Sequence, residues 1–289
     1  MKRPLATAVV GLALVTALTA LSACDDEPDE KGPTIGPGDQ YVALGDSYTA
    51  APGTGTESQD NCRQSIVDYP HQIAEETGAD LVDNSCSGAN TSHLTEAKIG
   101  TDAGPQLDAI DEDTDLVTMR LGANDFNLIG RIFFCSRLFR SDLPGTPCAD
   151  ADAKRGADSL DSRLPEVRAN LDRAVDDIED RAPDADIILI GYPHVAPAEG
   201  TCALLPLPAG DYDYARRVID GLNDALEAVA DDHDLTYIDM EGPSEGHDTC
   251  GEEPWMAGPV PEPGAAAPWH PYAAEGQAVA ELVLEELNQ

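Results

Sequence analysis

The stretch Gln40-Tyr-Val-Ala-Leu-Gly-Asp-Ser-Tyr48 decides the fold that this chain is expected to adopt. Its apolar residues, 41–45, form a run of the length of one buried strand, and polar residues end the run. Similar apolar runs recur at residues 80–83, 116–121, 187–190 and 235–239. Between them, apolar side chains three or four residues apart predict helices over residues 162–181, 214–230 and 273–287. This alternation predicts an α/β fold with a doubly wound, mostly parallel central sheet of about five strands.

Two long stretches do not follow the alternation. Residues 127–158 are rich in phenylalanine, and residues 241–268 are rich in proline and glycine. We expect both to be long loops at the functional end of the sheet.

The composition excludes whole classes of function. The 289 residues include 17 basic and 55 acidic side chains, so the formal net charge is −38. A surface of this sign repels nucleic acid. Hydrophobic residues make up 42% of the chain, enough for one sizeable core but too few for a protein with many membrane spans. Lysine is scarce, which is typical of proteins adapted to high salt; the alternative is an exported protein that is simply acidic.

The first residues have the pattern of a secretion signal. Lys2 and Arg3 precede an uncharged apolar run that ends at Ala23. Leu21-Ser-Ala-Cys24 resembles a bacterial lipobox, in which Cys24 is lipidated and becomes the mature N-terminus. An ordinary cleaved signal and an uncleaved single-span anchor are the alternatives. We therefore predict a signal peptide over residues 1–23, an acidic Pro/Gly tether over 24–39 and one domain over 40–289.

The other six cysteines indicate an oxidising compartment. An even number in an exported chain predicts three disulfides, although sequence alone leaves their connectivity open. Pairing of neighbours along the chain favours Cys62–Cys86, Cys135–Cys148 and Cys202–Cys250. A zinc site is the rival interpretation, but neither a C-x-x-C pair nor a matching pair of histidines is present. We therefore expect no zinc site.

Residues suited to nucleophilic catalysis follow three of the predicted strands. Ser47 comes after the first strand, Gly88 after the second and Asn124 after the third. Ligands of open α/β sheets bind at this edge, where a serine nucleophile, a glycine N–H and an asparagine amide could act together. His270 lies just before the last predicted helix and could be the base. Alone, Ser47 could equally be the N-cap of a helix.

Taken together these residues resemble a known family. Gly45-Asp-Ser-Tyr48, Gly88, Gly122-Ala-Asn-Asp125 and His270 are similar to the four ordered blocks of the SGNH hydrolases, or GDSL esterases and lipases. Local matches, among them Cys62-Arg63 and Gly191-Tyr-Pro193, resemble the actinobacterial branch that contains the Streptomyces scabies esterase. The resemblance covers residues 40–289 and implies a three-layer α/β/α flavodoxin-like fold.

The resemblance also implies a division of roles. Ser47 would attack the ester carbonyl, and His270 would take the serine proton and return it to the leaving alcohol. The backbone N–H groups of Ser47 and Gly88 and the side chain of Asn124 would bind the oxyanion. Neither metal nor cofactor is implied.

One position departs from the family pattern. Most members have an aspartate three residues before the histidine, where this chain has Ala267. The actinobacterial branch is understood to use a backbone carbonyl instead, so the carbonyl of Ala267, or one nearby in Pro268-Trp269, is expected to orient His270. This predicts a Ser-His dyad. A displaced carboxylate is the alternative, and Glu262 is the nearest acid upstream.

These observations predict an exported, monomeric serine esterase or lipase that acts on small-molecule or lipid esters. Its location would be extracellular or on the cell membrane, with Cys24 as its only attachment to lipid. The runner-up is a non-catalytic cell-envelope binding lipoprotein on an SGNH scaffold, and the missing aspartate is the feature that favours it.

Overall fold

The computed structural model describes residues 34–138 and 141–288, and its centre is a sheet of five parallel strands. The order β2-β1-β3-β4-β5 is the flavodoxin-like order of doubly wound folds. The strands are β1 (Gln40–Gly45), β2 (Asp80–Asp83), β3 (Thr114–Arg120), β4 (Asp186–Ile190) and β5 (Thr236–Ile238). Every predicted strand is therefore present, and the predicted fold class is confirmed.

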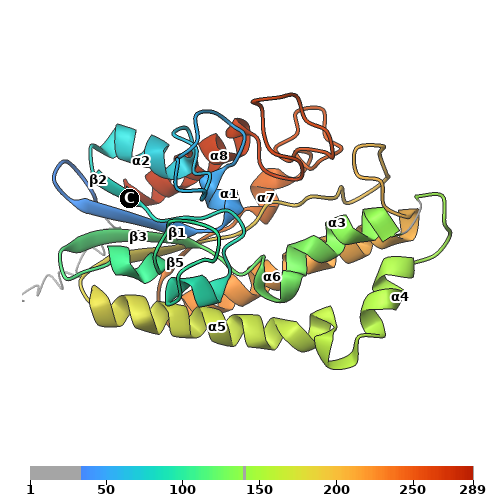
Figure 1. Ribbon diagram of the computed structural model, residues 1–289, viewed down its shortest axis with the longest axis horizontal. Helices are drawn as coiled ribbons and strands as arrows, with labels where there is room; N and C mark the ends of the chain where they lie inside the picture. Colours follow the sequence, from blue (N-terminus) through green and yellow to red (C-terminus); the bar gives the residue numbers. More distant parts are fainter. Residues whose placement is uncertain (1–33, 139–140, 289) are drawn as a thin grey trace, which may run out of the picture. The chain divides into compact units, whose positions relative to one another are not determined.

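Helices cover both faces of this sheet, as Figure 1 shows. They are α1 (Ser47–Ala50), α2 (Tyr69–Thr77), α3 (Leu128–Leu138), α4 (Pro147–Ala153), α5 (Leu160–Arg181), α6 (Tyr212–Asp232), α7 (Glu241–Ser244) and α8 (Ala273–Leu287). Helices α2 and α8 pack together on one face, and α5 and α6 pack together on the other. The result is a three-layer α/β/α domain.

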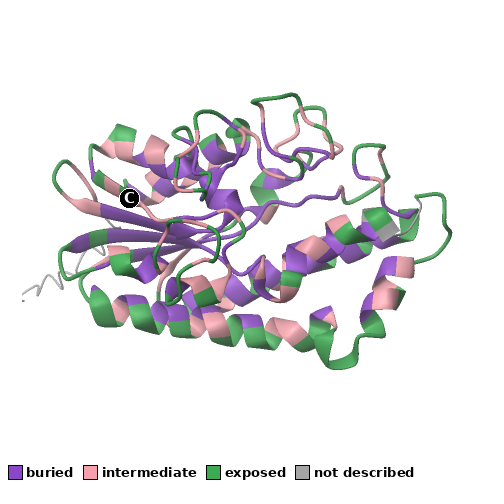
Figure 2. Ribbon diagram, in the orientation of Figure 1, coloured by how far each residue is buried: buried purple, intermediate pink, exposed green. Residues whose placement is uncertain are grey.

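Alternate side chains of each strand belong to the two halves of the core. In β1, Tyr41 and Ala43 face α2 and α8, whereas Val42 and Leu44 face α5 and α6. Both halves are closed to solvent, so the strands form the most buried part of the ribbon in Figure 2. A sheet buried on both faces explains why the strands are continuous apolar runs rather than alternating ones.

The prediction of a loop over residues 127–158 was wrong, because α3 and α4 lie there. Leu128, Ile132 and Cys135 are spaced three and four residues apart, and all three are buried. This is the pattern of one helix face. In the second predicted loop, residues 245–268 contain neither helix nor strand, although the four-residue helix α7 precedes them.

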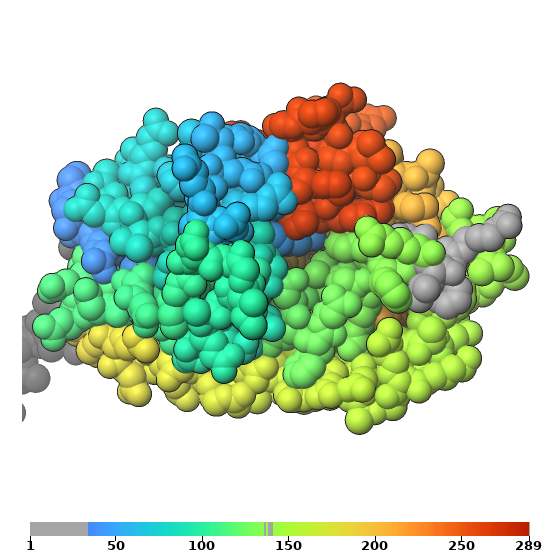
Figure 3. Space-filling model, viewed as in Figure 1, coloured from blue at the N-terminus to red at the C-terminus, as the bar shows by residue number. Residues whose placement is uncertain are grey.

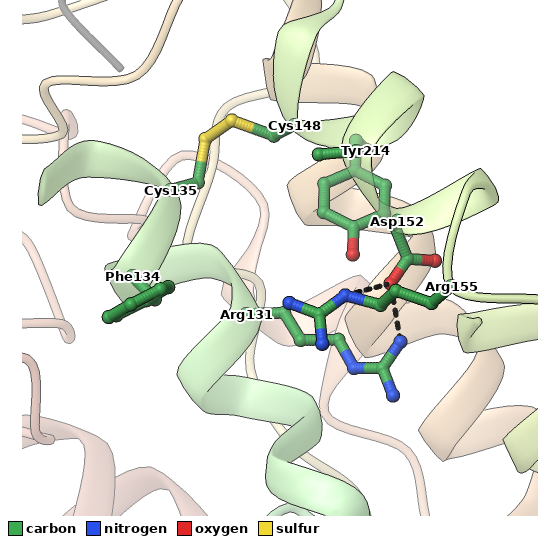
Figure 4. Close-up of a pocket in the computed structure, with 8 residues that line it drawn as sticks. Arg131, Phe134, Cys135, Cys148, Asp152, Arg155 and Tyr214 are labelled. Atoms are coloured by element: carbon green, nitrogen blue, oxygen red, sulfur yellow. Dashed lines mark hydrogen bonds and ion pairs between the residues drawn. A yellow bond between two sulfur atoms is a disulfide. The ribbon is translucent and has the colours of Figure 1, made fainter. Parts of the chain in front are cut away.

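A buried ion pair joins α3 to α4 (Figure 4). Arg131 Nη1 lies 2.5 Å from Asp152 Oδ1, and the other oxygen of Asp152 accepts the backbone N–H of Leu160 at 2.8 Å. The cavity beside this pair has a volume of about 30 Å³, which is the size of a single water. This cluster therefore holds three helices together.

The structure contains the three predicted disulfides, Cys62–Cys86, Cys135–Cys148 and Cys202–Cys250. The first joins the loop before α2 to the loop after β2. The second closes the connection between α3 and α4.

The predicted signal over residues 1–23, Cys24 and most of the tether over 24–39 lie outside the described residues. No helix of the described part is long and apolar enough to cross a membrane.

Two carboxyl groups meet where β2 ends and α2 begins. Asp68 caps α2 by accepting the backbone N–H of His71, and Asp83 accepts that of Ser85 at 3.0 Å. The Oδ2 atoms of Asp68 and Asp83 are both buried, and a hydrogen bond links the two side chains. Burial, and then the negative charge of Asp68, raises the pKa of Asp83 to about 8.

The raised pKa of Asp83 predicts that the free energy of unfolding decreases as the pH rises from about 4 to about 8. An unfolded aspartate loses its proton near pH 4, so in this range the folded state binds more protons, and raising the pH favours unfolding. Asp83→Asn retains an acceptor for Ser85 and cannot ionise. We expect the variant to unfold at a higher urea concentration than wild type at pH 8, with a flatter dependence on pH.

The matched control is Asp80→Asn, at the exposed start of the same strand. It should follow the wild-type dependence on pH. Parallel profiles for wild type and Asp83→Asn would contradict the assignment.

Candidate active site

A sharp turn after β1 places Ser47 at the carboxyl edge of the sheet. A Cβ at position 45 would lie 2.1 Å from Thr49 Oγ1, so only glycine allows α1 to begin so close to the strand. Asp46 caps α1, and Ser47 is its first residue. The N–H of a first helical residue has no acceptor within its own helix, which leaves that of Ser47 available to a ligand.

The carboxylate of Asp46 fixes this turn from its buried side. It is fully buried and accepts hydrogen bonds from Tyr48 N at 2.8 Å and Tyr192 Oη at 2.8 Å. Asn124 Nδ2 lies 3.4 Å from the same group. Burial raises the pKa of Asp46 to about 6, against the effect of these donors. At neutral pH Asp46 is therefore mostly ionised, and it supports the turn without lining the cavity described below.

Asn124 and Gly88 come together through one hydrogen bond. Asn124, just beyond the end of β3, donates from Nδ2 to the carbonyl of Ala89 at 2.8 Å. Gly88, next to Ala89, has a φ of +76°, which favours glycine at this position. The loop that contains Gly88 is fixed further by Cys86, which is bonded to Cys62.

His270 is oriented by a backbone carbonyl. Its Nδ1 lies 2.8 Å from the carbonyl oxygen of Pro268. Of the carbonyls predicted for this role, at Ala267 or nearby in Pro268-Trp269, the structure has that of Pro268, while the Ala267 oxygen accepts the backbone N–H of His270 at 3.2 Å. Trp269, between them, has a φ of +65°, a left-handed conformation that sequence alone does not reveal.

No carboxylate of the described residues forms a hydrogen bond or an ion pair with His270. Glu262, the alternative acid, is exposed to solvent.

The loop before His270 is also fixed at its start. The backbone N–H of Ala267 donates to the carbonyl of Pro52 at 2.7 Å, close to the end of α1. Figure 3 shows the corresponding blue and red segments side by side on the surface. A Cβ at Gly53 would lie 2.4 Å from Ala267 N, so glycine permits this approach. The segments that carry Ser47 and His270 therefore pack directly on each other.

The environment of His270 favours its neutral form. Burial lowers its pKa below 6.5, the hydrogen bond to Pro268 opposes this effect, and the positive charge of Arg63 lowers the pKa further. A carbonyl oxygen only accepts, so Nδ1 carries the ring proton. Nε2 of the neutral ring is then a free base, as general-base catalysis requires.

Ser47, Asn124 and His270 line one cavity of about 320 Å³. The walls are partly polar and partly apolar, and come from α3, from the residue before it and from the segment before His270. The ring of Phe133 stacks on that of Trp269 at 4.8 Å. The cavity-lining residues from these segments are Asn127, Ile129, Gly130, Phe133, Phe134, Arg137, Pro268 and Trp269.

Phe133 and Phe134 are neighbouring aromatic residues on α3. Both line the cavity. Asn127, Ile129 and Arg137 were missed, because residues 127–158 were taken for a loop. The helical spacing of apolar residues from Leu128 onward was the signal that could have found them.

The comparisons with known proteins agree with this geometry. Residues 43–277 match the model of the GDSL-like Lipase/Acylhydrolase family. The chain belongs to this family. This GDSL hydrolase is therefore a carboxylic ester hydrolase, as its motif blocks predicted.

Its relatives include Streptomyces lipases and esterases. The chain is 37% identical to Lipase 2 of Streptomyces coelicolor, over 98% of this chain and 93% of that protein. It is 29% identical to an esterase of Streptomyces scabiei, over 99% and 96% of the two chains. The solved structure of an extracellular lipase of Streptomyces rimosus superimposes with a TM-score of 0.71, at 27% identity, and covers 86% of this chain and 99% of that one.

The lowered pKa of His270 predicts the pH dependence of ester hydrolysis. Because the base must be neutral, kcat/KM should rise with pH through the pKa of His270, with a midpoint below 6.5. Arg63→Gln removes a positive charge and leaves its partner Glu57 unpaired. Both changes favour the imidazolium ion, so the midpoint should move to higher pH.

Arg173→Gln is the control for lost charge, because Arg173 is exposed on α5. Its midpoint should equal that of wild type. Equal midpoints for wild type and Arg63→Gln would show that Arg63 does not act on His270.

Proposed function

We propose that this GDSL hydrolase is an exported serine esterase or lipase that works through an acyl-Ser47 intermediate and a Ser47–His270 dyad. One observation carries the proposal. Ser47, Asn124 and His270 line the same cavity, and the ring of His270 is held by a carbonyl that leaves Nε2 free.

The chemistry follows from these positions. Ser47 Oγ attacks the ester carbonyl while its proton passes to His270 Nε2. The oxyanion accepts hydrogen bonds from the N–H groups of Ser47 and Gly88 and from the amide of Asn124. The carbon–oxygen bond to the alcohol then breaks, and His270 gives its proton to that oxygen. Water, activated by the same histidine, releases the acid and restores Ser47.

The Pro268 carbonyl replaces the usual carboxylate in one of its two roles. It accepts the Nδ1–H and so fixes both the tautomer and the orientation of the ring. It carries no full negative charge, so it stabilises the imidazolium ion less than an aspartate would. Arg63 and burial both lower the pKa of His270, which is consistent with a dyad that has no acid.

The cavity supports small esters or one acyl chain at a time as substrates. Its volume of about 320 Å³ is at the lower end of the range of small-molecule sites. Phe134 lines it and is half exposed, so an apolar surface continues from the cavity to solvent. This surface would suit a substrate whose acyl chain extends beyond the cavity. No nucleic acid and no cofactor take part.

Export is proposed from the sequence, the disulfides and a relative. The signal over residues 1–23 precedes a domain with three disulfides, which form in oxidising compartments. The Streptomyces rimosus relative is named an extracellular lipase. We propose that the domain acts as a monomer outside the cell, attached to the membrane through a lipid on Cys24.

Two substitutions test the dyad through hydrolysis of p-nitrophenyl butyrate. Ser47→Ala removes the nucleophile, and we expect kcat to fall by about three orders of magnitude or more. Glu262→Gln should leave kcat near the wild-type value, because the Pro268 carbonyl orients His270.

A hundredfold loss in Glu262→Gln would instead identify a carboxylate triad. Wild-type protein without Ser47-dependent hydrolysis of any ester in an acyl-length series would favour the non-catalytic binding lipoprotein.

A further inference from the structure

A buried ion pair lies directly beneath the catalytic turn. Arg120, the last residue of β3, donates from Nη2 to Glu275 Oε1 at 2.6 Å. The side chains of Arg120 and Glu275 are 0% and 1% exposed. Neither residue lines the cavity. Within the described residues, the only other ion pair with two such closed partners is Arg131–Asp152, between α3 and α4.

This pair is not arranged to maximise stability. Taking two charges out of water costs several kcal/mol for each ion, and their attraction offsets the cost only when all hydrogen bonds are made. Here Arg120 Nε and Glu275 Oε2 are buried and have no hydrogen-bond partner in the described part. An apolar pair of similar size often stabilises a fold as well as a buried ion pair does. Stability alone therefore does not explain this ion pair.

Arg120 contacts both neighbours of Ser47. Its carbonyl accepts the backbone N–H of Asp46 at 3.2 Å, and its Nη1 donates to the carbonyl of Tyr48 at 3.4 Å. The guanidinium also lies 5.5 Å from the ring centre of Tyr48 and 5.1 Å from that of Tyr192. These contacts hold the guanidinium of Arg120 against the turn that carries Ser47.

Glu275 lies close in the chain to His270, the second residue of the dyad. It lies in the first turn of α8, five residues after His270. A chain of backbone hydrogen bonds fixes the segment between them, since Glu275 N donates to Tyr272 O, and Tyr272 N donates to Trp255 O at 2.8 Å. The rings of Tyr48 and His270 lie 6.2 Å apart. The carbonyl of His270 accepts the backbone N–H of Ala257 at 3.0 Å, so His270 and the start of α8 are both held against the segment 255–257.

We propose that Arg120 and Glu275 are positioning residues, whose ion pair sets the distance between Ser47 and His270. Because an unpaired charge in this dry site is costly, neither the turn nor α8 can move away from the other without a large penalty. The inference rests on the proposed dyad. It adds a pair of residues, 155 positions apart, that act on the reaction without touching the substrate.

The test replaces the pair by apolar side chains in Arg120→Met/Glu275→Leu and measures both folding and catalysis. We expect a urea midpoint equal to or above that of wild type. In the same protein kcat should fall by about a hundredfold, because a misplacement of about 1 Å between reacting groups has that effect. KM should stay within about twofold of wild type, because the cavity walls from α3 and from Pro268 and Trp269 do not include the replaced residues.

Two further variants are needed: Arg120→Lys as an intermediate case, and a double variant of an exposed ion pair as the control. The lysine variant keeps the charge opposite Glu275 but loses the planar contacts to the Tyr48 carbonyl, so its kcat should lie between those of wild type and the double variant. Arg168→Met/Asp232→Leu removes an exposed pair between α5 and α6 and should leave kcat unchanged.

Each result of these measurements supports or overturns the inference. A folded double variant with kcat within twofold of wild type would overturn the inference, while the loss of activity in Ser47→Ala would still support the dyad. If the double variant does not fold, Arg120→Lys decides, since a wild-type kcat there would also overturn the inference. Wild-type hydrolysis that does not depend on Ser47 would overturn the proposed function itself.

Discussion

The buried carboxylate of Asp46 is the interaction on which the rest of the site depends. It joins three strands of the sheet at one point, because it caps the turn after β1 and accepts hydrogen bonds from beyond β3 and from beyond β4. Because the ionised carboxylate is buried away from water, it needs the hydrogen bonds from all three of these donors. As a result Ser47, Asn124 and Tyr192 occupy fixed places at the switch point of the sheet, where the connections from the central strands leave toward opposite faces and open a cleft.

The electrostatics of the site differ from those of the surface. The chain has a formal charge of −38, and a negative surface would raise the pKa of a histidine. The pKa of His270 is nevertheless lowered, because burial and the nearby Arg63 act at short range while distant carboxylates are screened by water and salt. Two of the 17 basic residues form buried ion pairs: Arg120 lies under the catalytic turn, and Arg131 joins α3, which lines the cavity, to α4. The acidity therefore concerns the solubility of the domain, not its chemistry.

Much of the fold and of the site could be predicted, because it depends on local pattern. The five strands are apolar runs, and Ser47, Gly88 and Asn124 each follow one of them. What escaped prediction depends on contacts far apart in the sequence or on single backbone angles. Helices α3 and α4 were predicted to be a loop because residues 127–158, which are rich in phenylalanine, do not follow the alternation of strands and helices. The helical spacing of Leu128, Ile132 and Cys135 was the opposing signal. The Pro268 carbonyl contacts His270 across Trp269, whose φ is positive. Arg120 stands in an apolar strand, and nothing near it in the sequence indicates Glu275 as its partner.

Activation of Ser47 by His270 without the help of an acid can be measured by reaction with diisopropyl fluorophosphate, followed by mass spectrometry of the digested protein. We expect one adduct per chain, on the peptide that contains Ser47, and labelling that slows by several orders of magnitude in His270→Ala but not in Glu262→Gln. An adduct on another residue, or labelling of Ser47 at the same rate without His270, would contradict it.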